Sequence, residues 1–376
     1  MTRHSSFFGT FTLLCTTAIV LTVPQIAHST EVKLVQDTSP ANPPTNAPAN
    51  PNLNDLLRQG RKLVDSGDYG KAFEIYQKAA SLDPKNPRIF SGIGYLEARQ
   101  GNFQGSVEFY QKAIALDPKN TDFYYGLAFA LANLQDYPGA SAAYRRSIEL
   151  DNKNLNSYLG LAVILYQQKD YNTALRIYQQ VIGVDPKNTQ AYALMGLVLM
   201  QQGNYPYAVK SLQQAAQLAP NDAKIKVKLG TAFVKNGSLK EGLAAFQDAA
   251  RLEPRNGDLQ FEIGELLRRE NELDKALDAY NKTVFLKPNL VEAHSAIGLI
   301  QLQKQDYLGA IITYRRVISL QPDNADAYYN LGIALKERER KEEAINAWQM
   351  ARDIYQKQGK TEGVEKAETR LNELNK

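Results

Sequence analysis

The sequence predicts an all-α protein, a superhelical solenoid built from stacked pairs of helices. Three observations support this prediction: a strict 34-residue period, two amphipathic stretches within each period, and small residues at fixed places in the period. The length of 376 residues would by itself suggest two or three ordinary domains. Internal repetition takes precedence over that estimate, because each repeat is one unit of structure that buries its apolar face against its neighbours.

Prolines mark the period. Neighbouring members of the series are 34 residues apart, except for one gap of 68 in which Asn152 occupies the missing place. The series consists of Pro84, Pro118, Pro186, Pro220, Pro254, Pro288 and Pro322. The phase therefore continues without insertion or deletion and divides residues 53–358 into nine repeats of 34 residues.

Each repeat is predicted to form two helices, as its third copy, residues 121–154, illustrates. Tyr124, Leu127 and Leu131 recur at intervals of three and four residues, which places them on one helical face. A second amphipathic stretch follows a short turn. Asp136 can cap that second helix by accepting hydrogen bonds from its free N–H groups, and Pro138 falls in its first turn, where a missing N–H costs least.

Small and large residues occupy fixed positions in every repeat. The eighth residue is glycine in seven repeats and alanine in the other two, although glycine inside a helix costs roughly 1 kcal/mol relative to alanine. The twentieth residue is also small, and the twenty-fourth is large in all nine repeats. We therefore expect the two helices of a repeat to approach closely, with the large residue beside that contact and reaching the next repeat. The large residues are Tyr76, Tyr110, Tyr144, Tyr178, Leu212, Phe246, Tyr280, Tyr314 and Trp348.

This pattern of spacing and residue size resembles the tetratricopeptide repeat (TPR) family over 306 of the 376 residues. The resemblance implies helix hairpins stacked into a right-handed superhelix with a concave groove. The family's aromatic residue at the fourth position is missing in four repeats, which contain Leu56, Lys226, Gln260 and His294 instead. The middle and late repeats are therefore expected to pack less tightly.

The segment 359–376 predicts one further helix. Val364, Ala367, Leu371 and Leu374 form an apolar stripe on an otherwise charged segment. The end of a solenoid needs such a half-polar helix to cover its core. We therefore expect a capping helix, with a coiled-coil partner as the alternative.

The first 52 residues differ from the repeats. Residues 1–29 have a weakly basic start, a mostly apolar run and small residues around Ala27-His28-Ser29, which is typical of a secretory signal peptide. Residues 30–52 are rich in proline and asparagine and predict a flexible tether. The protein is therefore expected to be exported, to the periplasm or the medium. The alternative is an uncleaved segment that anchors it to a membrane.

Few residues remain that could act in catalysis or bind a metal ion. The single cysteine, Cys15, and two of the three histidines, His4 and His28, fall in the predicted signal peptide, and His294 occupies a packing position. The glycines follow the repeat phase and form no phosphate-binding loop. Lys and Arg (44) nearly balance Asp and Glu (40), giving a net charge of +4, so nothing favours nucleic acid. We expect no enzymatic activity, no cofactor and no metal site, although a metal site assembled from several repeats would leave no local motif.

The candidate site is the side of each first helix that lies opposite its packing stripe, at positions 2, 5, 9, 12 and 13 of the repeat. The resemblance places this side in the concave groove. In repeats 2–5 it is apolar and aromatic with a few polar residues, a composition common at binding hot spots. The alternative is that these side chains pack between neighbouring first helices. The candidate residues are Tyr95, Arg99, Tyr125, Phe129, Asn133, Leu159, Val163, Tyr166, Leu197 and Met200.

In repeats 6 and 7 the same side is charged. Lys224, Lys228 and Lys235 of repeat 6 are followed by the acidic residues of repeat 7. A solvated face explains these charges better than a specific ionic site. Some TPR proteins hold a C-terminal carboxylate with lysines and asparagines, and only the basic part of that pattern is present here.

These features predict a non-catalytic scaffold or assembly factor outside the cytoplasm that binds a protein or peptide client in its groove. The layout of export signal, proline-rich tether and nine repeats resembles the periplasmic TPR factors that assist photosystem II assembly in cyanobacteria. A second class of function is structural, in which the chain self-associates through its ends within the cell envelope.

Overall fold

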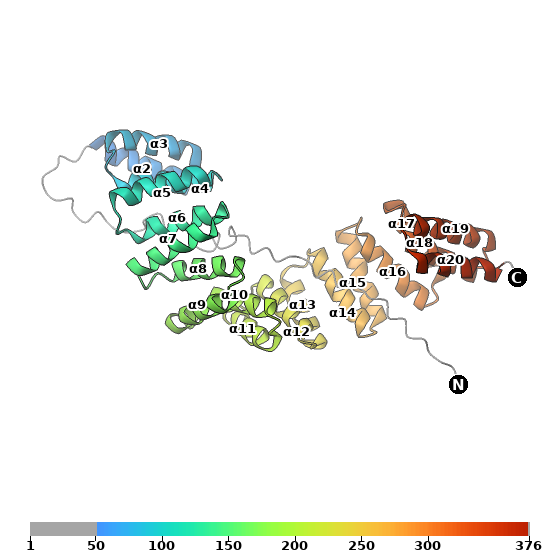
Figure 1. Cartoon of the computed structure of the whole chain (residues 1–376). Helices are drawn as coiled ribbons and strands as arrows, with labels where there is room; N and C mark the ends of the chain where they lie inside the picture. Colours follow the sequence, from blue (N-terminus) through green and yellow to red (C-terminus); the bar gives the residue numbers. More distant parts are fainter. Residues whose placement is uncertain (1–50, 375–376) are drawn as a thin grey trace. The chain divides into compact units, whose positions relative to one another are not determined.

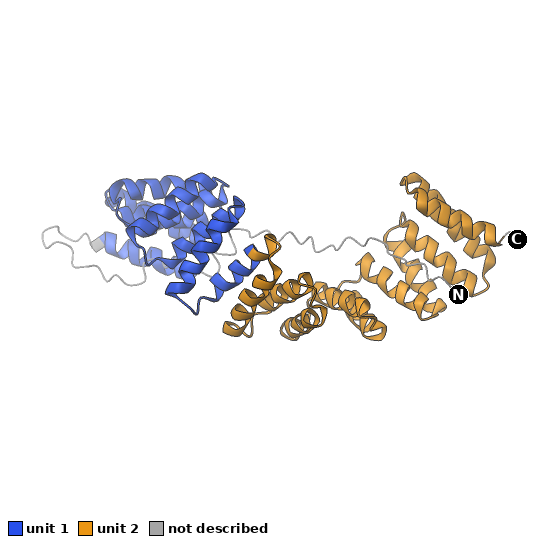
Figure 2. Ribbon diagram, turned by 60° about the horizontal axis from the view of Figure 1, so that its bottom comes forward, with its two compact units in different colours: residues 1–198 blue, residues 199–376 orange. Residues whose placement is uncertain are grey.

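The structure is a computed structural model that describes residues 51–374, and all regular elements in this range are helices. The predicted signal peptide (1–29) and the tether up to residue 50 lie outside the described residues. Helix α2 begins at Pro51, two residues before the predicted first repeat. The prediction of an all-α solenoid of helix-turn-helix repeats is confirmed. The chain divides into two compact units, Met1–Val198 and Leu199–Lys376 (Figure 2), and the division falls within α10.

In the first unit, first and second helices alternate along the chain (Figure 1). A first helix typically has 13 residues and a second helix 14. The helices are α2 (Pro51–Asp65), α3 (Tyr69–Leu82), α4 (Pro87–Arg99), α5 (Phe103–Leu116), α6 (Thr121–Asn133), α7 (Tyr137–Leu150), α8 (Leu155–Gln167), α9 (Tyr171–Val184) and α10 (Thr189–Gln201).

The second unit repeats the pattern and adds a final helix. Its helices after α10 are α11 (Tyr205–Leu218), α12 (Ala223–Lys235), α13 (Leu239–Leu252), α14 (Gly257–Arg269), α15 (Leu273–Leu286), α16 (Val291–Gln303), α17 (Tyr307–Leu320), α18 (Ala325–Glu337), α19 (Lys341–Lys357) and α20 (Thr361–Leu374).

Local chemistry sets these helix ends. Asp136 caps α7 as predicted, since its Oδ1 accepts a hydrogen bond from the Gly139 N–H at 3.0 Å. Between the first and second helix, the fifteenth residue of each repeat has a left-handed backbone, with φ from 59° to 84°. Glycine adopts this conformation without strain, yet five repeats use another residue. These are Gln135, Lys169, Asn271, Gln305 and Glu339.

Where a repeat contains the periodic proline, its second helix ends just before that residue. Second helices followed by that proline end two residues before it, as α3 ends at Leu82 before Pro84. The last repeat has Gln356 at this place, and α19 continues to Lys357, giving a helix of 17 residues. A proline inside a helix would remove a backbone hydrogen bond and clash with the preceding turn, so its absence permits the extra length. Helix α7 also lacks the proline, with Asn152 at this place, and still ends at Leu150.

The large residue at position 24 organises the core. The ring of Tyr76 lies against Gly60 in its own repeat and against Gly92 in the next, and Tyr110 lies in the same way between Gly94 and Gly126. The glycines at position 8 thus make room mainly for an aromatic ring, as well as for the approach of the two backbones. Position 6 is glycine in repeats 2–4, as Gly92, Gly126 and Gly160, and there it forms the other side of this ring pocket, which the sequence pattern did not predict.

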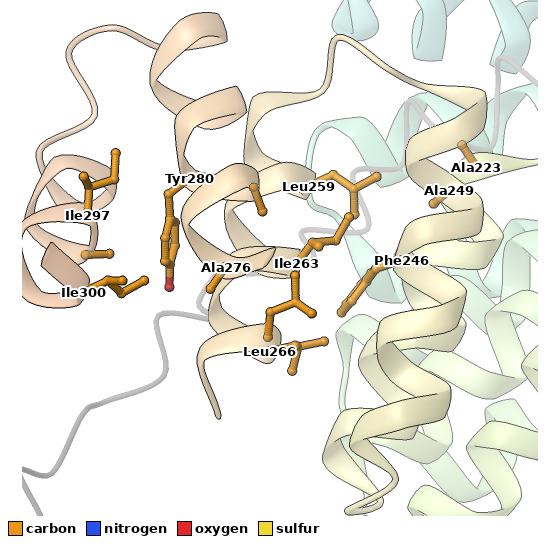
Figure 3. Close-up of a cluster of buried hydrophobic side chains, with 13 residues drawn as sticks. Ala223, Phe246, Ala249, Leu259, Ile263, Leu266, Ala276, Tyr280, Ile297 and Ile300 are labelled. Atoms are coloured by element: carbon orange, nitrogen blue, oxygen red, sulfur yellow. The ribbon is translucent and has the colours of Figure 1, made fainter. Parts of the chain in front are cut away.

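In the second unit, buried side chains from α12 to α16 form one continuous cluster. Figure 3 shows Tyr280 of α15 extending toward Ile297 and Ile300 of α16. At the C-terminal end of the unit, α20 buries Ala367 and Leu371, and Leu374 packs against the same core as Trp348. Within residues 51–374, no helix has both the length and the apolar character required to cross a membrane.

Candidate functional site

The candidate site lies on one side of each first helix. We call the side that contains positions 2, 9 and 13 of each repeat the front face. These positions are seven and then four residues apart, so they align on one side of a helix. Within the first unit α4 contacts α6 and α6 contacts α8, so these first helices are neighbours.

Three of the predicted site residues are enclosed in the core. Leu159, Val163 and Leu197 are each at most 2% exposed. Helix α8 is buried nearly all round, as expected for a helix that is apolar on every side. For these three residues the structure therefore supports the alternative role of core packing, and they offer no surface to a client.

Two predicted tyrosines are also largely buried. Tyr125 packs edge-on against Tyr144 of α7, and Tyr166 packs against Tyr171 of α9. Both phenol rings stabilise contacts between first and second helices. Replacing either ring would therefore test folding more than binding, so Tyr125 and Tyr166 are poor probes of a client site.

The other predicted residues in the first unit remain partly accessible, and the structure brings them together on α4 and α6. Tyr95 and Phe129 are half-buried, and Arg99 is exposed. Phe129 packs against Phe103 of α5, and its carbonyl oxygen accepts a hydrogen bond from Asn133 Nδ2 at 2.8 Å. Met200, which lies on α10 in the second unit, is also half-buried.

Arg99 is held in place by aromatic rings. Its Nη2 donates to the Tyr69 hydroxyl at 2.7 Å, and its guanidinium carbon lies 5.0 Å from the centre of the Tyr69 ring and 6.0 Å from that of Tyr95. Such contacts favour a cation and fix its orientation. Arg99 therefore presents an ordered positive group beside an accessible tyrosine.

The structure adds two arginines that the sequence prediction missed. Arg88 is exposed at position 2 of α4, and Arg61 is exposed at position 9 of α2. Among residues 51–374, neither arginine nor Arg99 forms an ion pair. The signal is present in the sequence, because Arg88, Tyr95 and Arg99 follow the seven-and-four spacing, but an exposed arginine is also common on solvated faces.

On the front face of the second unit, some charges bond to other side chains of the chain. Glu265 Oε1 accepts from the Tyr280 hydroxyl at 2.5 Å, and its Oε2 pairs with Arg268 at 2.9 Å. Two half-buried charges nearby are destabilised by desolvation: burial raises the pKa of Glu262 and lowers the pKa of Lys228. This face is therefore occupied largely by interactions within the chain.

Side chains that could bind a metal ion are scattered among the described residues. Within the described range, no three His, Cys, Asp or Glu side chains gather closely enough to hold a metal ion. His294 lies in the packing position predicted for it, with Nε2 at 2.9 Å from the carbonyl oxygen of Pro288. The Tyr124 hydroxyl donates the corresponding bond to the carbonyl oxygen of Pro118, which ends the preceding repeat. His294 thus replaces the missing aromatic residue of its repeat.

Comparisons with known families agree with this architecture. Models described as tetratricopeptide repeat match residues 134–198, 165–229, 227–290 and 326–361. A model described as TPR repeat matches residues 60–101, 94–135 and 300–338. Together these matches cover most of the nine predicted repeats.

Individual relatives are more distant. A TPR repeat-containing protein of Picosynechococcus sp. is 37% identical over 54 residues, which amount to 14% of this chain and 14% of that protein. The C-terminal part of a TPR repeat-containing protein from Cytophaga hutchinsonii is 18% identical, with a TM-score of 0.58 over 63% of this chain and 98% of that one. A tetratricopeptide repeat protein from Parabacteroides merdae is 17% identical, with a TM-score of 0.51 over 66% and 99%. These likenesses show the fold.

Proposed function

Because the chain belongs to the tetratricopeptide-repeat family, whose members are generally non-catalytic scaffolds for protein–protein interaction, we propose that it binds a protein client on the front face of its first unit and has no catalytic activity. The observation that carries this proposal is the accessible group formed by Tyr95, Arg99, Phe129 and Asn133 on adjacent helices. Aromatic side chains beside an ordered arginine are enriched where interfaces gain most of their energy.

Changing Tyr95 and Phe129 together to alanine is expected to reduce client capture by at least about tenfold, because each aromatic anchor contributes on the order of 1–2 kcal/mol at such sites. The measurement is affinity capture from an extract of the native host, quantified by mass spectrometry. Phe285→Ala is the matched control, since Phe285 is 84% exposed on the second helix α15 and lies off the front face. Capture that survives the double substitution, with helical circular dichroism unchanged, would exclude this surface.

The proposed location is outside the cytoplasm. The signal-like segment 1–29 supports this proposal, and cleavage after Ser29 would leave Thr30 as the first residue. We expect N-terminal sequencing of the protein from periplasmic or extracellular fractions to begin at Thr30. Recovery of the uncleaved chain in the membrane fraction would favour an anchor, and uncleaved chain in the cytoplasm would refute export.

A more specific version is that the protein is a periplasmic assembly factor for photosystem II in a cyanobacterium. This version rests on the layout of export signal, proline-rich tether and nine repeats. Its client would be an extracytoplasmic segment of a photosystem subunit. Occurrence of the gene in a non-photosynthetic bacterium would eliminate it.

A structural role through self-association has less support. Leu371 and Leu374, the apolar residues that would join one copy to the next, pack inward against the core of the second unit. The first described helix, α2, exposes mainly polar residues, including Asn54, Asp55 and Arg58. Client binding is therefore the function that the described residues favour.

A further inference from the structure

The front face of α4 combines an accessible tyrosine with two arginines that form no ion pair within residues 51–374. Arg88 and Arg99 are both exposed, and Tyr95 lies between them along the helix. No acidic residue occupies the front face of α4. Charged groups across a protein interface are arranged so that their potentials are complementary, so this pair of arginines suits a partner of negative charge.

Arg99 is the better ordered of the two. Its guanidinium is fixed by the Tyr69 hydroxyl and by two aromatic rings, so one of its five N–H donors is used by the described residues. The remaining donors have the fork geometry that suits a carboxylate. Because the side chain is already oriented, a carboxylate can bind with little further loss of side-chain entropy.

Flanking charges restrict where an acidic group can lie. Arg61 on α2 is close enough to influence the Tyr76 hydroxyl, and the Tyr76 ring lies against Gly92 of α4, which places Arg61 beside this face. The repeats before and after that of α4 carry acidic residues on their first helices, Asp65 on α2 and Asp122 on α6. Burial and the neighbouring Asp151 raise the pKa of Asp122. Acidic groups of a partner are therefore drawn to α4 itself.

We propose that the client segment is acidic and extended, and that its carboxylates pair with Arg88 and Arg99 while its backbone or an apolar side chain covers Tyr95. This inference rests on the proposed client-binding function and specifies the chemistry of the client. Positions 2 and 13 of a helix are about 16 Å apart at 1.5 Å per residue. An extended segment spans that distance in about five residues, so two acidic side chains with this spacing match the two arginines.

The test uses random ten-residue peptides displayed on phage and selected on the whole chain. We expect retained peptides to contain at least about twice as much Asp and Glu as the starting library. Arg88→Glu combined with Arg99→Glu should reverse this preference toward Lys and Arg. Arg88→Gln alone, which breaks no side-chain hydrogen bond or ion pair within residues 51–374, should reduce the binding of a retained acidic peptide about threefold, in line with a single exposed ion pair.

Lys224→Gln combined with Lys235→Gln on α12 is the matched control, because these exposed lysines also form no ion pair within residues 51–374. The acidic preference should survive in this variant. Retained peptides without an acidic preference, an absence of retained peptides, or a preference that depends on Lys224 and Lys235 would each overturn the inference. The proposed function fails separately, if client capture does not depend on Tyr95 and Phe129.

Discussion

Replacing Trp348 by alanine is expected to destabilise the C-terminal repeats by about 3–5 kcal/mol, the range for removing a fully buried tryptophan. Trp348 is completely buried, and its ring lies against Gly332. Its Nε1 donates to the Tyr329 carbonyl oxygen at 3.0 Å. The substitution leaves a cavity in the cluster shared by α17, α18, α19 and α20.

Hydrogen exchange and urea unfolding measure this effect. Repeat proteins are stabilised mainly by contacts between neighbours, so exchange should accelerate most in α18, α19 and α20 and least in the first unit. Met350→Ala on the same helix is a suitable control, because Met350 is 45% exposed and its loss should cost less than about 1 kcal/mol. A uniform acceleration throughout the chain would contradict this local role.

Gly126→Ala is expected to destabilise the first unit by about 2–3 kcal/mol, because a methyl group has no space there. A Cβ at this position would lie 2.6 Å from the Tyr110 hydroxyl oxygen and closer still to two carbons of the ring. Tyr110 is itself enclosed between α4 and α6, so the ring cannot move without displacing a helix. The clash outweighs the roughly 1 kcal/mol that alanine normally gains over glycine within a helix.

The midpoint of urea unfolding, followed by circular dichroism, tests this expectation. Gly70→Ala on α3 provides the matched control, since a Cβ there would meet no atom within 4 Å. That substitution should be neutral or stabilise the protein by up to about 1 kcal/mol. Equal effects of the two substitutions would show that the Tyr110 ring yields to the methyl group.

The repeat period allowed most of the fold to be predicted from the sequence. Prolines, capping residues and small positions recur in phase, and each has a local physical effect, so the helix limits follow within a few residues. The longer α19 is permitted by Gln356, which stands where seven repeats have proline, whereas α7 ends at Leu150 although Asn152 replaces the proline there. The glycine at position 6 was missed because its purpose depends on a ring from the preceding repeat.

The candidate site could be predicted only in part. A rotation of about 100° per residue identifies the side of the helix on which Leu159 and Val163 lie, but it does not reveal how far the neighbouring helices cover that side. The continuous apolar run from Leu159 to Tyr166 was the available sign of complete burial. Exposed groups such as Arg88 and Arg99 were harder to interpret, because their importance lies in the lack of an acidic partner within the described chain.

The ring pocket shared by successive repeats limits their modularity. The ring of Tyr144 lies against Gly160 of the following repeat, so the residue at position 24 of one repeat must suit position 6 of the next. A second copy of residues 121–154 would satisfy this condition, because it would place Gly126 after Tyr144. Residues 223–256 in the same place would set Lys228 against that ring. The repeats share one period, yet they are not interchangeable parts, and the array can be lengthened or recombined only at joints where the two residues match.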